Sequence, residues 1–254
     1  MTGSTTNTIN RTHSSKNSGN PNESFCSDFG RVFEEGVLPI CIDQGVVGAS
    51  KRHIGWKVSE QCKIQCNNSE TKRHQSILLT YSIHFYVKCS LLALDYGYHL
   101  PMFLTGLVET DPPYSFLSFE GSIDMILVGG SQNRLLTHVD KIIPALKLGL
   151  QSGHRNSVSK AVYCFLLLLI CDEANPYNGA MARAITPYLR RLLPTLSLYI
   201  NDTHKIGTEG AYQVEERSLG GLVEEVLETC ERRGGPGVGK IVKYCVPTYQ
   251  SVLK

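Results

Sequence analysis

One phrase occurs twice in this chain, first as Ile142-Ile143-Pro144-Ala145-Leu146-Lys147-Leu148 and, fifty residues later, as Leu192-Leu193-Pro194-Thr195-Leu196-Ser197-Leu198. Looser versions surround Pro101 and Pro247, so the intervals between the prolines are 43, 50 and 53 residues. Stacked helix pairs of the HEAT and armadillo kinds repeat at roughly 40–47 residues. The sequence therefore predicts an all-α, armadillo/HEAT-like helical-repeat solenoid in one compact domain, and this fold places function on its surfaces.

Helical periodicity extends over most of the chain on both sides of this phrase. Apolar residues at helical spacing predict a first helix over 25–33, a helix buried on all sides over 158–171, and a glutamate-rich helix over 212–233. Glycines predict further ends: Gly121 should close a short helix that starts at Tyr114, and the last helix should span 238–253. Residues 38–42 are predicted to be extended, because Pro39 disfavours helical backbone before it.

The bulk composition is typical of a soluble globular protein, with 42% apolar and 19% charged residues. A formal net charge of +2 gives no argument for nucleic acid as a partner. The longest apolar run, 161–171, is too short to cross a bilayer, so no membrane is expected. Nine cysteines, an odd number, and a polar N-terminus without a signal-peptide core predict reduced thiols and a cytoplasmic location.

Residues 1–24 contain almost no large apolar side chain, and we expect a disordered N-terminal arm ahead of a domain over 25–254. An alternative is an arm that becomes ordered on a partner. Within the domain, residues 59–90 lack a clean helical or strand period and are interpreted as an insertion.

No stretch of the chain predicts catalysis, a cofactor or a metal. Gly234–Lys240 matches a phosphate-binding loop, but a charged helix precedes it where a strand is needed, and Ile241 follows where a hydroxyl is needed. Cys62, Cys66 and His74 do not complete a zinc set. The glutamates of the 212–233 helix, and Arg183, Arg190 and Arg191, are interpreted as solvated faces, with an acidic partner for the arginines as the alternative.

The only tryptophan, Trp56, stands beside His53 and Lys57 in a cationic stretch. One interpretation is an amphipathic residue that seals the end of the helical array. The other is a partner-binding site, because interfaces are enriched in tryptophan and arginine. We take Trp56, His53 and Lys57 as the candidate partner-binding residues.

Several segments in the same order resemble the parkin co-regulated gene product family. The resemblance covers most of residues 29–58 and 91–254. It is carried by these segments: Phe33-Glu-Glu-Gly-Val-Leu-Pro-Ile40, Ile54-Gly-Trp-Lys-Val58, Leu94-Asp-Tyr-Gly-Tyr-His-Leu-Pro101, Gly106-Leu-Val-Glu-Thr110, Pro113-Tyr114, Leu193-Pro194, the Leu222 to Arg232 helix and Lys243-Tyr-Cys-Val-Pro-Thr-Tyr-Gln-Ser251.

This resemblance implies an armadillo-like, non-catalytic protein of the cytoskeleton in cilia and flagella. Such proteins lie at the inner junction of axonemal doublet microtubules, between the A- and B-tubules, where they contact α/β tubulin and a neighbouring small β-rich junction protein. Their N-terminal arm lies along the microtubule. The runner-up function is a soluble helical adaptor of another assembly, without tubulin contact.

Mammalian members of the family also bind a small meiosis-expressed partner through a tryptophan and nearby polar residues. The resemblance aligns Trp56 with that tryptophan and His53 with a companion lysine, whereas a later histidine falls on Val128. A carboxylate expected just after Val58 is displaced by the insertion.

Residues 59–90 interrupt the family pattern, because members pass almost directly from Trp-Lys-Val to Leu-Asp-Tyr. The dipeptide Val58-Ser59 can be encoded by a splice-donor consensus, and a Cys89-Ser90 junction can contain an acceptor. Our hypothesis is that much of this stretch is a retained intron. Sequencing of the mature transcript across the junction tests it, and a message that carries the segment would refute it.

Overall fold

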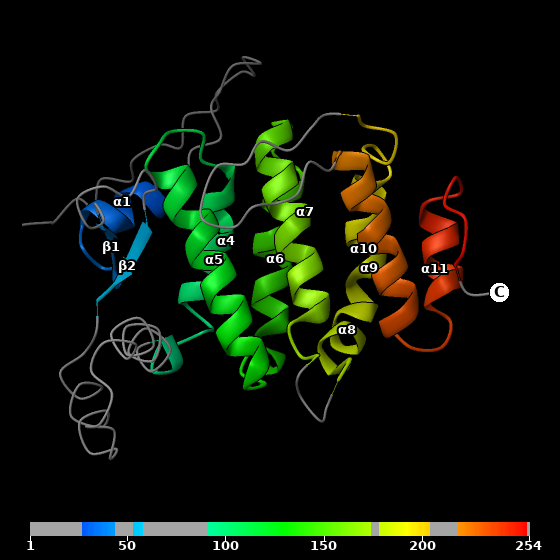
Figure 1. Ribbon diagram of the computed structural model, residues 1–254, viewed down its shortest axis with the longest axis horizontal. Coiled ribbons are helices and arrows are strands. Elements are labelled where there is room, and N and C mark those ends of the chain that lie inside the picture. Colours follow the sequence, from blue (N-terminus) through cyan, green and yellow to red (C-terminus); the bar gives the residue numbers. More distant parts are fainter. Residues whose placement is uncertain (1–26, 44–52, 58–90, 174–177, 204–217, 253–254) are drawn as a thin grey trace, which may run out of the picture.

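The computed structural model describes residues 27–43, 53–57, 91–173, 178–203 and 218–252. This part of the chain is mostly helical, with one small two-stranded sheet, and is compatible with the predicted all-α class. Figure 1 shows the helices following one another along the long axis, from α1 and a small β-hairpin at one end to α11 at the other. The predicted arm 1–24 and the insertion 59–90 lie outside the described residues.

The helices form two rows that pack against each other. One row is made of α5 (Tyr114–Ser131), α7 (Arg155–Ile170) and α10 (Leu219–Arg233), each contacting the next. The other row is made of α4 (His99–Thr105), α6 (Val139–Leu150), α9 (Leu189–Leu196) and α11 (Val238–Cys245), again in sequential contact. The short helices α1 (Phe29–Glu34) and α8 (Ala180–Ile185) complete the fold.

The repeated phrase forms the same local structure twice. A short 3-10 turn, Leu136–His138, leads into α6, and a second one, Thr186–Tyr188, leads into α9. Each proline lies inside its helix, at Pro144 and Pro194. The apolar positions that are fifty residues apart are buried in both copies: Val139 and Leu189, Ile142 and Leu192, Ile143 and Leu193, Leu146 and Leu196.

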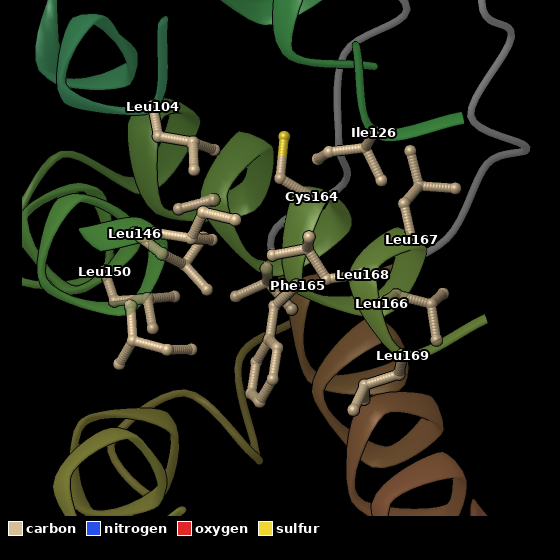
Figure 2. Packing of buried hydrophobic residues seen from close by; sticks show 14 of the residues in the cluster. Leu104, Ile126, Leu146, Leu150, Cys164, Phe165, Leu166, Leu167, Leu168 and Leu169 are labelled. Carbon is tan, nitrogen blue, oxygen red and sulfur yellow. The ribbon is translucent and has the colours of Figure 1, made fainter. Parts of the chain in front are cut away.

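The centre of the core is α7, which was predicted to be buried on all sides. Its side chains Cys164, Phe165 and Leu168 have no exposed surface. Figure 2 shows them between Leu146 and Leu150 of α6 on one side and Ile126 of α5 on the other. Burial of this kind stabilises a protein by about 25 cal/mol for each Å² of apolar surface removed from water.

Two predicted helix ends are wrong. Gly121 does not close a helix, because α5 continues through it to Ser131; a side-chain Cβ at this position would lie 2.2 Å from Cε1 of Phe103, so the glycine allows a close approach of the Phe103 ring. The last helix ends at Cys245 and not at 253. Val246 has left the helical region (φ −131°, ψ 81°), as expected of a residue that precedes a proline.

The extended segment predicted around Pro39 is confirmed as a strand. Strand β1 (Ile40–Asp43) pairs antiparallel with β2 (His53–Trp56), with Ile40 opposite Trp56 and Asp43 opposite His53. The hairpin contacts α5 through β2. The predicted first helix is confirmed from Phe29 onward as α1, whose Phe29 and Val32 are buried.

Candidate partner-binding surfaces

The predicted site around Trp56 is centred on a buried side chain. Trp56 is 7% exposed, and its Nε1–H donates to Oδ2 of Asp124 in α5 over 2.8 Å. The indole ring lies 5.6 Å from the Phe103 ring, centroid to centroid. Tryptophan prefers this arrangement, with an apolar body in the core and its N–H satisfied. The side chain therefore holds the hairpin against the helices.

The other two residues of the predicted site differ from Trp56, since one is exposed and the side chain of the other is not described. Lys57 is exposed, and its backbone N–H donates to the carbonyl of Pro39 over 2.8 Å, which extends the hairpin pairing by one bond. His53 belongs to β2, but its side chain lies outside the described part of the structure. A partner-binding role for Trp56, His53 and Lys57 stays a prediction.

A second cluster fastens the N-terminal helix beside this hairpin. The backbone N–H and the hydroxyl of Ser27 donate to Oε1 of Glu109 over 3.1 and 2.6 Å, and Tyr114 donates its hydroxyl to Glu34. That bond to Glu34 raises the pKa of Tyr114. These residues line a groove of about 480 Å³. Nothing in the sequence signals this groove, because the two hydrogen-bonded pairs join residues that are 82 and 80 positions apart.

Among the described residues there is neither a metal-binding cluster nor a membrane-spanning helix. They contain no group of three or more histidine, cysteine, aspartate or glutamate residues that could hold a metal ion. Cys62, Cys66 and His74 lie outside them. Within the described segments, no helix combines the length and apolar character needed to cross a bilayer.

Residues 234–237 of the glycine-rich segment form a turn between two helices, and residues 238–240 already belong to the second helix. The turn joins α10 to α11, and Gly235 and Gly237 adopt positive φ angles of 93° and 87°, which glycine reaches without steric cost. A phosphate-binding loop requires a preceding strand, and here the preceding element is a helix.

The sequence of the chain matches a known family over most of its length. The sequence profile of the Parkin co-regulated protein family matches residues 61–251. The chain belongs to the Parkin co-regulated protein family. The mouse Parkin coregulated gene protein homolog is 32% identical over 167 residues, which are 65% of this chain and 66% of the mouse protein. The match thus spans just under two thirds of that relative.

The C-terminal end of this family member is fastened by a carboxylate that we had expected to be solvated. Glu231 is 7% exposed, and it accepts hydrogen bonds from the hydroxyls of Tyr249 and Ser251 and from the backbone N–H of Val252. The solvated-face interpretation is therefore wrong for Glu231, because the chain beyond Pro247 folds back over α10. Burial, and then the bond to Glu231, raise the pKa of Tyr249.

The arginines singled out in the sequence lie at the surface, as expected. Arg183 of α8 and Arg190 and Arg191 of α9 are all exposed. Two more cations, Lys240 and Lys243, are exposed on the adjacent α11. Beside them Tyr244 is 81% exposed and Leu198, just after α9, is 76% exposed, the two highest values among the large apolar side chains of the described segments. Sequence reasoning missed this grouping, because it depends on the packing of α9 against α11.

Proposed function

We propose that this chain is a non-catalytic structural protein of the ciliary or flagellar axoneme. It bridges the A- and B-tubules at the inner junction of doublet microtubules, and it binds α/β tubulin and a neighbouring junction protein there. The observation that carries the proposal is membership of the Parkin co-regulated protein family over residues 61–251. Its location is the cytoskeleton of the cilium, within the cytoplasm.

An armadillo-like stack is the architecture that we propose for this role. The support is the equivalence of the two proline-containing units, each a 3-10 turn followed by a helix with the same buried positions. Stacked units build a long surface in which each unit contacts only its neighbours. Such a surface can contact several partners along a lattice without a cleft or a bound cofactor.

The hairpin is the proposed docking point for a small meiosis-expressed partner. The exposed Lys57 can contact such a partner directly. Trp56 acts from beneath, since its bond to Asp124 fixes the hairpin on α5. Replacing Trp56 would then weaken this partnership through the position of the hairpin.

Salt extraction of isolated axonemes tests the proposed function against the runner-up, a soluble helical adaptor without tubulin contact. The expected result is that the protein stays in the doublet fraction after extraction with concentrated salt, together with tubulin. Release into the soluble fraction, with the doublets intact and a known junction component retained, would favour the adaptor. A soluble axonemal protein followed in the same samples shows that extraction was complete.

A further inference from the structure

Two segments near the C-terminal end of the fold carry positive charge and no acidic residue. The stretches 174–201 and 232–254 contain eight lysines and arginines and no aspartate or glutamate. Because the whole chain carries +2, subtracting these eight charges leaves −6 on the remainder. That −6 lies entirely in residues 202–231, which include α10, while residues 1–173 sum to zero. The positive charge is therefore gathered on the segments that contain α9 and α11, next to the acidic α10.

The two repeat units differ in charge at one pair of equivalent positions. Arg190 and Arg191 of α9 occupy the positions of Asp140 and Lys141 of α6, fifty residues earlier in the equivalent unit. The earlier pair is neutral in sum and the later pair is doubly positive. Both arginines are exposed, and among the described residues neither has an ion-pair partner.

The cations of α9 and α11 belong to one surface. The two helices contact each other, and Arg190 lies close enough to Cys245 of α11 for its charge to oppose the rise in the pKa of that thiol caused by burial. On α11, Lys240, Lys243 and Tyr244 line a hollow of about 640 Å³.

Hydrogen bonds hold two charged side chains of this hollow in place. The carboxylate of Glu231, which also lines it, accepts the three hydrogen bonds that fasten the C-terminal segment. Lys243 donates from Nζ to the carbonyls of Pro247 and Tyr249, over 2.7 and 2.8 Å. In the part of the chain that the structure describes, Lys243 forms no ion pair with a carboxylate.

We propose that this surface, formed by Arg190, Arg191, Lys240, Lys243 and Tyr244, binds an acidic, extended protein segment. Charge complementarity selects the partner: carboxylates pair with the unpaired cations, and the exposed Tyr244 offers the aromatic contact typical of interfaces. The proposal deepens the proposed function, since it assigns the surface that faces an acidic partner of the junction.

Binding of a fluorescent peptide of about ten glutamates to the full chain, measured by fluorescence anisotropy at low salt, tests the proposal. Low salt is used because charges are screened beyond about 10 Å at 0.1 M ionic strength. We expect binding that weakens as salt is added. The triple variant R190Q/R191Q/K240Q should lose about tenfold or more in affinity, as three exposed ion pairs predict.

A matched pair of single variants locates the effect. Arg191→Gln should weaken binding by about two- to threefold, whereas Lys141→Gln, which removes the same charge at the equivalent position of α6, should leave it unchanged. Equal losses in the two variants, no loss in the triple variant, or tighter binding of a DNA duplex than of the peptide would overturn the proposal. Circular dichroism of each variant confirms that it is folded.

Sedimentation with microtubules separates this proposal from the proposed function. Microtubules are compared before and after limited proteolysis that removes the acidic tubulin tails. Loss of sedimentation on tail removal and in the triple variant supports both ideas. Peptide binding without any sedimentation would support the acidic-segment site while contradicting tubulin contact. Sedimentation that ignores both the tails and the triple variant, with no peptide binding, would overturn the site and leave the proposed function standing.

Discussion

The indole N–H of Trp56 donates to Oδ2 of Asp124 over 2.8 Å, across 68 residues of sequence. This bond joins the β-hairpin to the middle of α5, and the ring beside it contacts Phe103. The Trp56 side chain thus attaches the hairpin to the helical body through one polar and one apolar contact, and the two can be removed separately.

Substitution of Trp56 should separate these attachments. Trp56→Phe keeps a ring but removes the donor to Asp124, and we expect the free energy of unfolding to fall by about 1–2 kcal/mol. Trp56→Ala also opens a cavity and should cost about 3–5 kcal/mol. Urea unfolding followed by far-ultraviolet circular dichroism measures both. Equal losses in the two variants would show that the hydrogen bond to Asp124 carries the whole effect.

Removal of the Tyr96 hydroxyl should stabilise the protein. Tyr96 is 2% exposed, and among the described residues its Oη has no hydrogen-bond partner. An unsatisfied buried polar group costs about 1–3 kcal/mol, so Tyr96→Phe should gain about 1 kcal/mol at pH 7. A less stable variant in urea unfolding would contradict this account of the hydroxyl.

The same residue gives the protein a dependence on alkaline pH. Burial raises the pKa of Tyr96 to about 12. Above the unfolded pKa near 10, the unfolded chain releases this proton while the folded chain keeps it. Folding stability should therefore be unaffected by Tyr96 below pH 10 and fall by up to about 1.4 kcal/mol per pH unit between 10 and 12. Melting temperatures between pH 8 and 11 should fall less steeply in Tyr96→Phe than in the wild type.

Arg233 should matter far more than its neighbour Arg232. Arg233 is 14% exposed at its side chain and its Nη2 lies 2.8 Å from Oδ1 of Asp172, which is almost fully buried. Arg233→Met leaves that buried carboxylate without its cation and should cost about 3–5 kcal/mol. Arg232→Met breaks only an exposed pair with Glu228 and should cost less than about 1 kcal/mol. Chemical unfolding of both variants gives the comparison, and similar costs would refute it.

The two prolines of the repeated phrase should behave alike. Pro144 and Pro194 each stand inside a helix, exposed, where a backbone donor is missing. Replacement by alanine should stabilise the protein in both cases, because alanine is favoured by up to about 3 kcal/mol in a helix interior. The two gains, measured by urea unfolding, should agree within about 1 kcal/mol. Changes of opposite sign would contradict the structural equivalence of the two units.

Local periodicity was enough to predict the helices but not the contacts between them. The apolar stripes at Ile142–Leu146 and Leu192–Leu196 are buried as expected, since a helix in water must bury its apolar face. Gly121 was misread because glycine serves both to end a helix and to admit a neighbour, and only the position of Phe103 distinguishes the two. Glu231 was misread because its partners lie 18–21 residues away on a returning segment.

The candidate surfaces were harder to predict from the sequence than the helices, because they depend on how the helices pack. Trp56 stood out in the sequence as the only residue of its type, but its orientation toward Asp124 was not readable there. The sequence shows only part of the cationic surface: Arg190 and Arg191 stand out as a basic pair, whereas Lys240 and Lys243 lie in segments that stand out for other features. Contact between α9 and α11 brings the two pairs to one surface.

Cryo-electron microscopy of isolated doublet microtubules tests the central claim most directly. At the inner junction, between the A- and B-tubules, we predict density that fits the two rows of helices, with α5, α7 and α10 in one row and α4, α6, α9 and α11 in the other. Density at that junction that cannot hold this fold, in doublets whose protein composition includes the chain, would contradict the claim.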